Sequence, residues 1–314
     1  MDDVRYARNG DVRIAYESFG DLATGEPLLL VMGLDFQMVW WPDELIGLLV
    51  EAGFAVVRFD NRDTGLSTHF EPVEKPNPWK ALMGRVPPSY TARDMLDDAL
   101  AVMDAVGWQH AHVMGGSMGA GLAQGLALEY PDRVQSLVSC MGLPVTSGPF
   151  RTLRYIRPGV FRTLARIDPG PSDDEQVEAL VEIYRAIASP GYQFAEDWVR
   201  QAARTSHERH PRDPSTTQRQ LAAGRAHRYP DLDTITAPTL VISGQDDPLI
   251  RWRGGRDTAA GIPGARFVSY PGMGHSIPPE LYASVVDEVR ANADRAVARK
   301  RQEPADGFRD HPRA

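Results

Sequence analysis

A serine in a glycine-rich segment has the surroundings that most strongly indicate chemistry. Segment 115–119 reads Gly-Gly-Ser-Met-Gly and matches the pattern G-x-S-x-G around Ser117. It directly follows the apolar run 111–114 and opens a helix-like run over 118–130, which is the strand–turn–helix context of a nucleophile elbow. Small residues permit the tight turn, and the serine Oγ then points out of the sheet at the positive end of a helix. The alternative is a turn whose serine only caps the helix.

A histidine near the C-terminus is the candidate base for this serine. A serine hydroxyl is a weak nucleophile at neutral pH and needs a base, which itself is oriented by a carboxylate. Of the 8 histidines, only His275 follows the last predicted strand, where the base of such a serine is found. Residues 271–275 read Pro-Gly-Met-Gly-His, and the glycines on both sides of Met273 allow a loop that turns the imidazole back over the sheet.

Two neighbouring aspartates compete for the role of the carboxylate. The loop after the penultimate predicted strand reads Gly-Gln-Asp-Asp-Pro over 244–248. The spacing G-x-x-D followed by proline or a small apolar residue favours Asp247. Asp246 is the runner-up, and in the favoured assignment it organises the turn.

Backbone N–H groups are expected to bind the negative charge that develops on a substrate carbonyl oxygen. One donor is expected from Met118, the residue after the nucleophile. The other is expected from Leu34 beside Gly33, in the turn after the first parallel strand. Neither role depends on a side chain, so the residue type at these two positions is free.

Short apolar runs ending at glycine or aspartate alternate with helix-like runs along the chain. The strand-like runs cover residues 27–33, 54–60, 111–116, 136–142, 238–244 and 265–272. The helix-like runs cover residues 41–51, 91–106, 118–129, 253–260 and 279–298. This alternation predicts an α/β fold with a mostly parallel, doubly wound sheet covered on both faces. The alternating segment 11–20 predicts an additional antiparallel strand or hairpin.

One long interval breaks the alternation and indicates an inserted helical region. Residues 144–230 contain amphipathic stretches at 150–166, 173–188, 193–206 and 215–226 and no strand-like run. We therefore expect a core of 1–143 and 231–298, with 144–230 forming a helical cap over the carboxyl ends of the strands. Residues 299–314 are poor in apolar side chains, so we expect a disordered tail.

The cap is expected to shape the substrate pocket. It carries large apolar side chains at helical spacing, including Tyr184 and Trp198, and some of these must pack the cap onto the core. Those that face the sheet would line an apolar pocket together with Gly33 and Trp40. We therefore expect esters with bulky hydrophobic or aromatic acid parts to be better substrates than acetates.

Composition excludes several classes of function. The chain has 314 residues and a formal net charge of −8. A net negative charge disfavours binding to the phosphate backbone, so we expect no nucleic-acid partner. The single cysteine, Cys140, allows neither an intrachain disulfide nor a thiolate metal cluster. We expect no metal, no cofactor and no membrane segment, and no leader sequence is recognisable, so a cytoplasmic location is expected. The oligomeric state is not determined by the sequence.

The motifs together resemble the α/β-hydrolase superfamily over nearly the whole chain. The matching segments are LLLVMGL (28–34), FDNRDTGLS (59–67), VMGGSMG (113–119), YPDRVQSLV (130–138), LVISGQDDPLI (240–250) and PGMGHSIP (271–278). The order Ser117, Asp247, His275 is the order of these hydrolases. Met32-Gly33 in place of the common His-Gly, the WPDEL that follows, and the loop 61–67 resemble more narrowly the aclacinomycin methylesterase-like group.

The resemblance implies hydrolysis of an ester through an acyl-enzyme on Ser117, with a methyl ester on a bulky aromatic polyketide as one such substrate. The same triad also serves thioesterases, lactonases, C–C hydrolases and perhydrolases. A haloalkane dehalogenase or an epoxide hydrolase would need an aspartate at position 117. A different class, a non-catalytic ligand-binding protein on the hydrolase fold, often lacks members of the triad, whereas this chain has all three.

Overall fold

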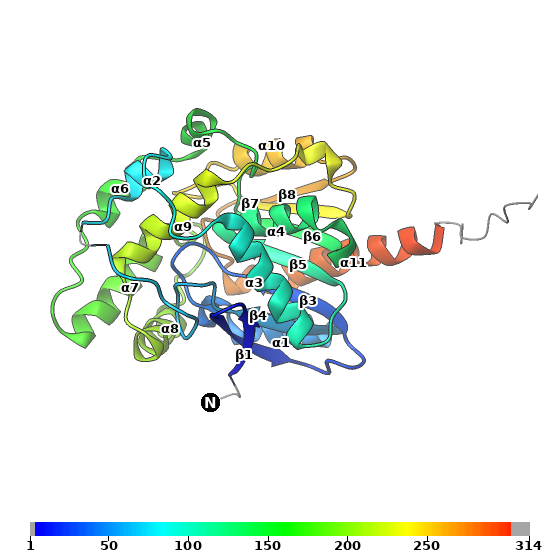
Figure 1. Cartoon of the computed structure of the whole chain (residues 1–314), viewed down its shortest axis with the longest axis horizontal. Helices are drawn as coiled ribbons and strands as arrows, with labels where there is room; N and C mark the ends of the chain where they lie inside the picture. Colours follow the sequence, from blue (N-terminus) through cyan, green and yellow to red (C-terminus); the bar gives the residue numbers. More distant parts are fainter. Residues whose placement is uncertain (1–3, 74, 303–314) are drawn as a thin grey trace, which may run out of the picture.

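The computed structural model describes residues 4–73 and 75–302, and its centre is an eight-stranded sheet (Figure 1). The strands are β1 (Arg5–Asn9), β2 (Val12–Phe19), β3 (Glu26–Val31), β4 (Phe54–Phe59), β5 (Ala111–Gly116), β6 (Val134–Cys140), β7 (Thr239–Gly244) and β8 (Arg266–Tyr270). Their order in the sheet is β1-β2-β4-β3-β5-β6-β7-β8. From β4 to β8 all neighbours are parallel, while β2 is antiparallel to both β1 and β4. The predicted α/β fold with a mostly parallel sheet is confirmed.

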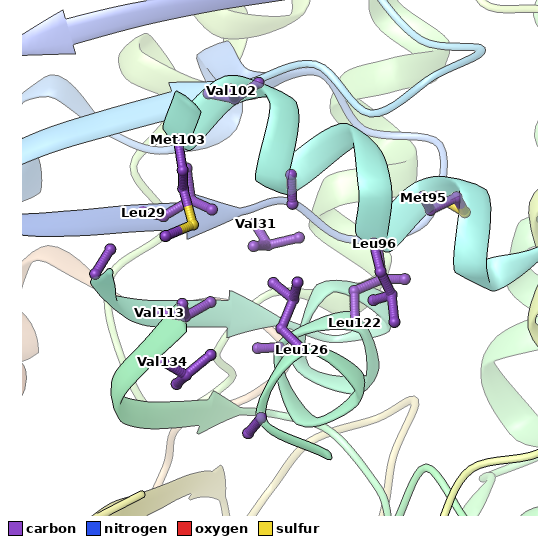
Figure 2. Packing of buried hydrophobic residues seen from close by; sticks show 14 of the residues in the cluster. Leu29, Val31, Met95, Leu96, Val102, Met103, Val113, Leu122, Leu126 and Val134 are labelled. Atoms are coloured by element: carbon purple, nitrogen blue, oxygen red, sulfur yellow. The ribbon is translucent and has the colours of Figure 1, made fainter. Parts of the chain in front are cut away.

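The sheet is covered on both faces, and its strands β4, β5 and β7 are buried at every position. On β3, Leu29 and Val31 belong to one buried cluster, with α3 (Ala92–Ala105) and α4 (Met118–Glu129). Leu28 and Leu30 belong to the other cluster, with α1 (Asp43–Glu51) and α11 (Tyr282–Gln302). Successive side chains of a strand point to opposite faces, so one apolar run serves both clusters. Figure 2 shows the first cluster, with Met95 and Leu96 of α3 and Leu122 and Leu126 of α4.

The expected helical region between β6 and β7 holds five helices. They are α5 (Pro149–Tyr155), α6 (Gly159–Leu164), α7 (Asp173–Ile187), α8 (Glu196–Arg209) and α9 (Pro214–Ala226). Figure 1 shows α6 to α9 gathered on one side of the sheet, whereas α11 leaves on the opposite side. The remaining helices are α2 (Pro78–Leu82), α10 (Arg253–Gly261) and the 3₁₀ turns η1 (Met38–Trp40), η2 (Pro131–Arg133), η3 (Leu232–Thr234) and η4 (Pro279–Leu281).

Two sequence expectations need correction. The run 150–166 is not one helix, because Ile156 between α5 and α6 is extended and forms an antiparallel bridge with Ile250. The predicted tail 299–314 begins too early, because α11 continues to Gln302. Arginine, lysine and glutamine have high helix propensity, so these polar residues prolong a helix that is already packed through Ala293 and Ala296. Residues 303–314 lie outside the described part of the chain.

No helix in residues 4–73 and 75–302 is long and apolar enough to cross a membrane.

Buried ion pairs fasten the helices between β6 and β7 to the loop after β4. Arg209 at the end of α8 lies 2.5 Å from the fully buried carboxylate of Asp60. Arg219 on α9 makes a bidentate contact with Asp63, at 2.5 and 2.8 Å, and a second ion pair with Asp213 at 2.7 Å. The Arg219 and Asp63 side chains are 2% and 0% exposed, so neither can exchange its partner for water.

Replacing Arg219 should therefore test how strongly this attachment stabilises the fold. Arg219→Met leaves the Asp63 carboxylate buried without its cation, and we expect a loss of about 3–5 kcal/mol in the free energy of unfolding. Arg200→Met is the matched control, because Arg200 also bridges two carboxylates, Glu178 and Glu196, but at the surface. Urea and thermal unfolding should show a large loss for Arg219→Met and little change for Arg200→Met. Equal effects of the two variants would contradict the prediction.

Candidate active site

The turn between β5 and α4 holds Ser117 in a backbone conformation that few residues adopt. Its φ and ψ are 56° and −117°. A Cβ on Gly115 would lie 2.0 Å from the carbonyl oxygen of Gly119, and a Cβ on Gly119 would lie 2.1 Å from the carbonyl oxygen of Val31. Any side chain at either glycine would clash with backbone atoms, so both positions require glycine. The G-x-S-x-G pattern therefore reflects the close approach of α4 to β3.

The Ser117 side chain is directed away from the helix that it opens. Its hydroxyl makes no capping hydrogen bond to α4 and instead lies 2.9 Å from Nε2 of His275. The Ser117 N–H donates to the carbonyl of Cys140 at 2.9 Å, which ties the turn to the end of β6. The helix N-terminus places a positive partial charge beside the oxygen. The alternative that Ser117 only caps α4 therefore does not agree with the geometry.

His275 joins the serine to one of the two candidate carboxylates. Its Nδ1 lies 2.7 Å from Oδ2 of Asp247, whose side chain is 2% exposed. The other oxygen of Asp247 accepts the N–H groups of Leu249 and Ile250 at 2.7 and 2.8 Å. These bonds fix the carboxylate, and the carboxylate in turn fixes the Nδ1 side of the ring.

Asp246 occupies a different position, although it is the adjacent residue. Its exposed carboxylate accepts the N–H of Gly272 at 2.8 Å, and its own N–H donates to the carbonyl of Met273 at 3.0 Å. Asp246 therefore braces the loop that carries His275 from outside, whereas Asp247 contacts the ring.

The two expected oxyanion donors flank Ser117. Met118 is the first residue of α4, so its N–H has no acceptor within the helix. Gly33 lies so close that a Cβ there would be 3.2 Å from the Cβ of Ser117, and Leu34 follows it. Asp35, next along, has φ 64° and donates its N–H to Oε1 of Gln220 on α9 at 2.9 Å. The segments that carry the two expected donors therefore both adjoin the serine.

Cys140 offers no rival nucleophile in this region. Burial raises the pKa of its thiol to about 12, so the thiol is protonated at neutral pH.

Three of the four residues expected to contact substrate form one aromatic cluster. Trp40 of the core stacks on Tyr184 of α7, with ring centroids 4.9 Å apart and an angle of 21° between the planes. Trp198 of α8 contacts both edge-on, at 6.0 Å from Trp40 and 5.6 Å from Tyr184. These contacts join α7 and α8 to the core, and Trp40 is buried. Trp40, Tyr184 and Trp198 therefore all take part in packing the helices between β6 and β7 onto the core.

Segments between β6 and β7 also contact the loops that carry the site, which the sequence did not predict. Residues 155–157 pair with 249–251, next to the Asp247 loop. Residues 187–191 hydrogen-bond to the His275 loop over 272–276. These contacts are made mostly by backbone groups, which every residue type carries, so no sequence signal could have revealed them.

A family model described as the alpha/beta hydrolase fold matches residues 27–280. The chain belongs to the α/β-hydrolase family. Among curated relatives of this α/β hydrolase, the rhodomycin D methylesterase DnrP of Streptomyces peucetius is 30% identical, over 92% of this chain and 97% of the relative. DauP of Streptomyces sp., another rhodomycin D methylesterase, is 28% identical over the same shares. The resemblance to the methylesterase-like group is confirmed by these relatives.

Solved structures share the fold of this α/β hydrolase. A meta-cleavage product hydrolase of Pseudomonas fluorescens superposes with a TM-score of 0.67 at 19% identity, covering 93% of this chain and 98% of that one. The enol-lactonase of Burkholderia xenovorans gives 0.64 at 21% identity, covering 94% and 100%. At this level of identity the likeness concerns the fold alone.

The steric basis of the elbow can be tested with two glycines of the same helix. Gly119→Ala places a methyl group against the Val31 carbonyl, so we expect a strong loss of thermal stability or of folded protein. Gly121→Ala is the control, because a Cβ there meets only Val145, at 3.7 Å. Alanine should suit this helical position and stabilise it by up to about 1 kcal/mol. Melting temperatures that fall equally in the two variants would refute the steric argument.

Proposed function

We propose that this α/β hydrolase is a serine esterase that works through an acyl-enzyme on Ser117. The observation that supports this proposal is the continuous chain of contacts from Ser117 Oγ to His275 Nε2 and from His275 Nδ1 to Asp247, at 2.9 and 2.7 Å. A hydroxyl, an imidazole and a buried carboxylate in this arrangement supply the nucleophile, the base and its orienting partner.

The reaction follows from that geometry in two steps. Ser117 Oγ attacks the ester carbonyl and transfers its proton to His275 Nε2, while Asp247 stabilises the imidazolium that results. The N–H groups of Met118 and Leu34 bind the oxyanion of the tetrahedral intermediate. As the intermediate collapses, His275 donates its proton to the departing alkoxide oxygen, which leaves as the alcohol. In the second step His275 accepts a proton from water as the water oxygen attacks the acyl-enzyme carbonyl. His275 then returns that proton to Ser117 Oγ as the C–Oγ bond breaks, and the acid is released.

We propose a methyl ester on a bulky aromatic acid as the substrate class. Support comes from the two rhodomycin D methylesterases, which align with this chain over nearly their full length. We further propose that residues 144–230 act as the cap, with Gly33, Trp40, Tyr184 and Trp198 on the substrate side. Tyr184 lies on α7, whose last residue, Ile187, accepts the N–H of His275, so this helix and the base are mechanically joined.

A substrate panel with a nucleophile variant tests the proposed function. Wild type should release methanol from aromatic methyl esters faster than it hydrolyses p-nitrophenyl acetate, lactones, thioesters or C–C substrates, and a phosphonate should label it stoichiometrically. Ser117→Ala should fold, remain unlabelled and lose on the order of 10⁴-fold or more of kcat. Near-native turnover by Ser117→Ala would reject the triad. No turnover of the panel and no labelling of wild type would favour a ligand-binding protein.

The adjacent aspartates provide a matched pair for the carboxylate. Asp247→Asn keeps the shape of the side chain but favours the wrong imidazole tautomer, so kcat should fall roughly 10²–10⁴-fold. Asp246→Asn keeps a carbonyl oxygen for the Gly272 N–H and does not touch the ring, so kcat should change far less. Steady-state kinetics on one ester give the ranking, and the reverse order would assign the carboxylate to Asp246.

A further inference from the structure

The residue types in the loop that carries His275 do little to restrict its backbone conformation. Residues 272–274 are Gly-Met-Gly, and Gly272 has φ +75°. Glycines restrict the backbone least, so such a loop permits many positions of the following residue. The contacts between Asp246 and residues 272–273 hold the start of the loop, upstream of the two residues that flank His275.

A single serine outside the hydrolase core contacts a backbone group of each of those two residues. Ser189 follows α7, and its Oγ accepts the N–H of Gly274 at 2.8 Å. The same Oγ donates to the carbonyl of Ser276 at 2.7 Å. Its neighbour Ile187 accepts the N–H of His275 at 2.9 Å. The residues before and after the imidazole are thus bridged by one hydroxyl.

The loop packs closely against the segment that carries Ser189. A Cβ on Gly274 would lie 2.2 Å from the carbonyl oxygen of Ala188, and Gly191 donates its N–H to the carbonyl of Gly272 at 2.9 Å. Ser189 is 8% exposed, so water cannot readily replace its hydroxyl in either hydrogen bond.

We infer that Ser189 is a positioning residue, which sets the distance from His275 Nε2 to Ser117 by bridging Gly274 and Ser276. The inference rests on the proposed role of His275 as the base. On this inference, the segment after α7 helps to place the base, although that segment touches neither the nucleophile nor the carboxylate. A displacement of about 1 Å in a reacting group can cost on the order of 10²-fold in rate.

The test compares Ser189→Ala with a serine that makes the same kind of contact elsewhere. Ser215 on α9 is 3% exposed, accepts the N–H of Val73 at 2.9 Å and donates to its carbonyl at 3.4 Å. Ser189→Ala leaves buried backbone groups without a partner and Ser215→Ala leaves partly buried ones, so both should lower the melting temperature. Only Ser189→Ala should lower kcat, by about 10–100-fold with little change in KM. Ser189→Cys, which keeps a weak donor and acceptor, should give an intermediate kcat and carries the comparison if Ser189→Ala does not fold.

A proton NMR signature separates failure of this inference from failure of the proposed function. The Nδ1–H of His275, shared with Asp247, should give a far-downfield resonance in wild type and in Ser215→Ala. It should broaden or vanish in folded Ser189→Ala. This signal needs no turnover, so it reports on the position of His275 even if the protein hydrolyses no ester. An unchanged resonance, together with a kcat equal to that of Ser215→Ala, would overturn the inference.

Discussion

The structure depends on how closely the first turn of α4 approaches β3. Only a hydrogen atom fits between Gly119 and the Val31 carbonyl, and the same holds between Gly115 and Gly119. This contact bends the chain so sharply at Ser117 that φ becomes positive, a conformation that non-glycine residues rarely adopt. Such strain persists only where the surroundings over-determine it, and here both sides of the turn are fully packed. The side chain is thereby separated from the helix and presented at the carboxyl edge of the sheet.

The helices between β6 and β7 act on this edge through several independent attachments. Arg209 and Arg219 fasten α8 and α9 to the loop after β4 through buried ion pairs. Gln220 holds the N–H of Asp35, next to the expected oxyanion donor Leu34. The bridge from Ile156 to Ile250 adjoins the loop of Asp247. The segments between β6 and β7 therefore support the loops that carry Leu34, Asp247 and His275.

Asp246 and Asp247 show how environment divides identical side chains between two tasks. Asp247 is directed inward, where two backbone N–H groups and the imidazole occupy its oxygens. Asp246 is directed outward and accepts the N–H of Gly272, across the loop. Both contribute to the place of His275, one through the ring and the other through the backbone. The opposite directions of these two neighbouring side chains, rather than their residue type, give them different roles.

The sequence by itself determined the fold class and the identity of the residues that meet at the site. Apolar runs alternating with amphipathic ones dictate a covered parallel sheet, and G-x-S-x-G marks Ser117 because glycine is the only residue that tolerates such contacts. Local patterns also singled out His275 and favoured Asp247 by spacing. Tertiary structure alone decided which residues between β6 and β7 contact the loops of Asp247 and His275, and that α11 extends past residue 298. It also decided that Trp40, Tyr184 and Trp198 pack on one another and that Ser189 bridges the His275 loop. The physical reason is that these contacts join backbone groups or common side chains across long stretches of chain, and a hydrogen bond to a peptide group leaves no trace in residue type.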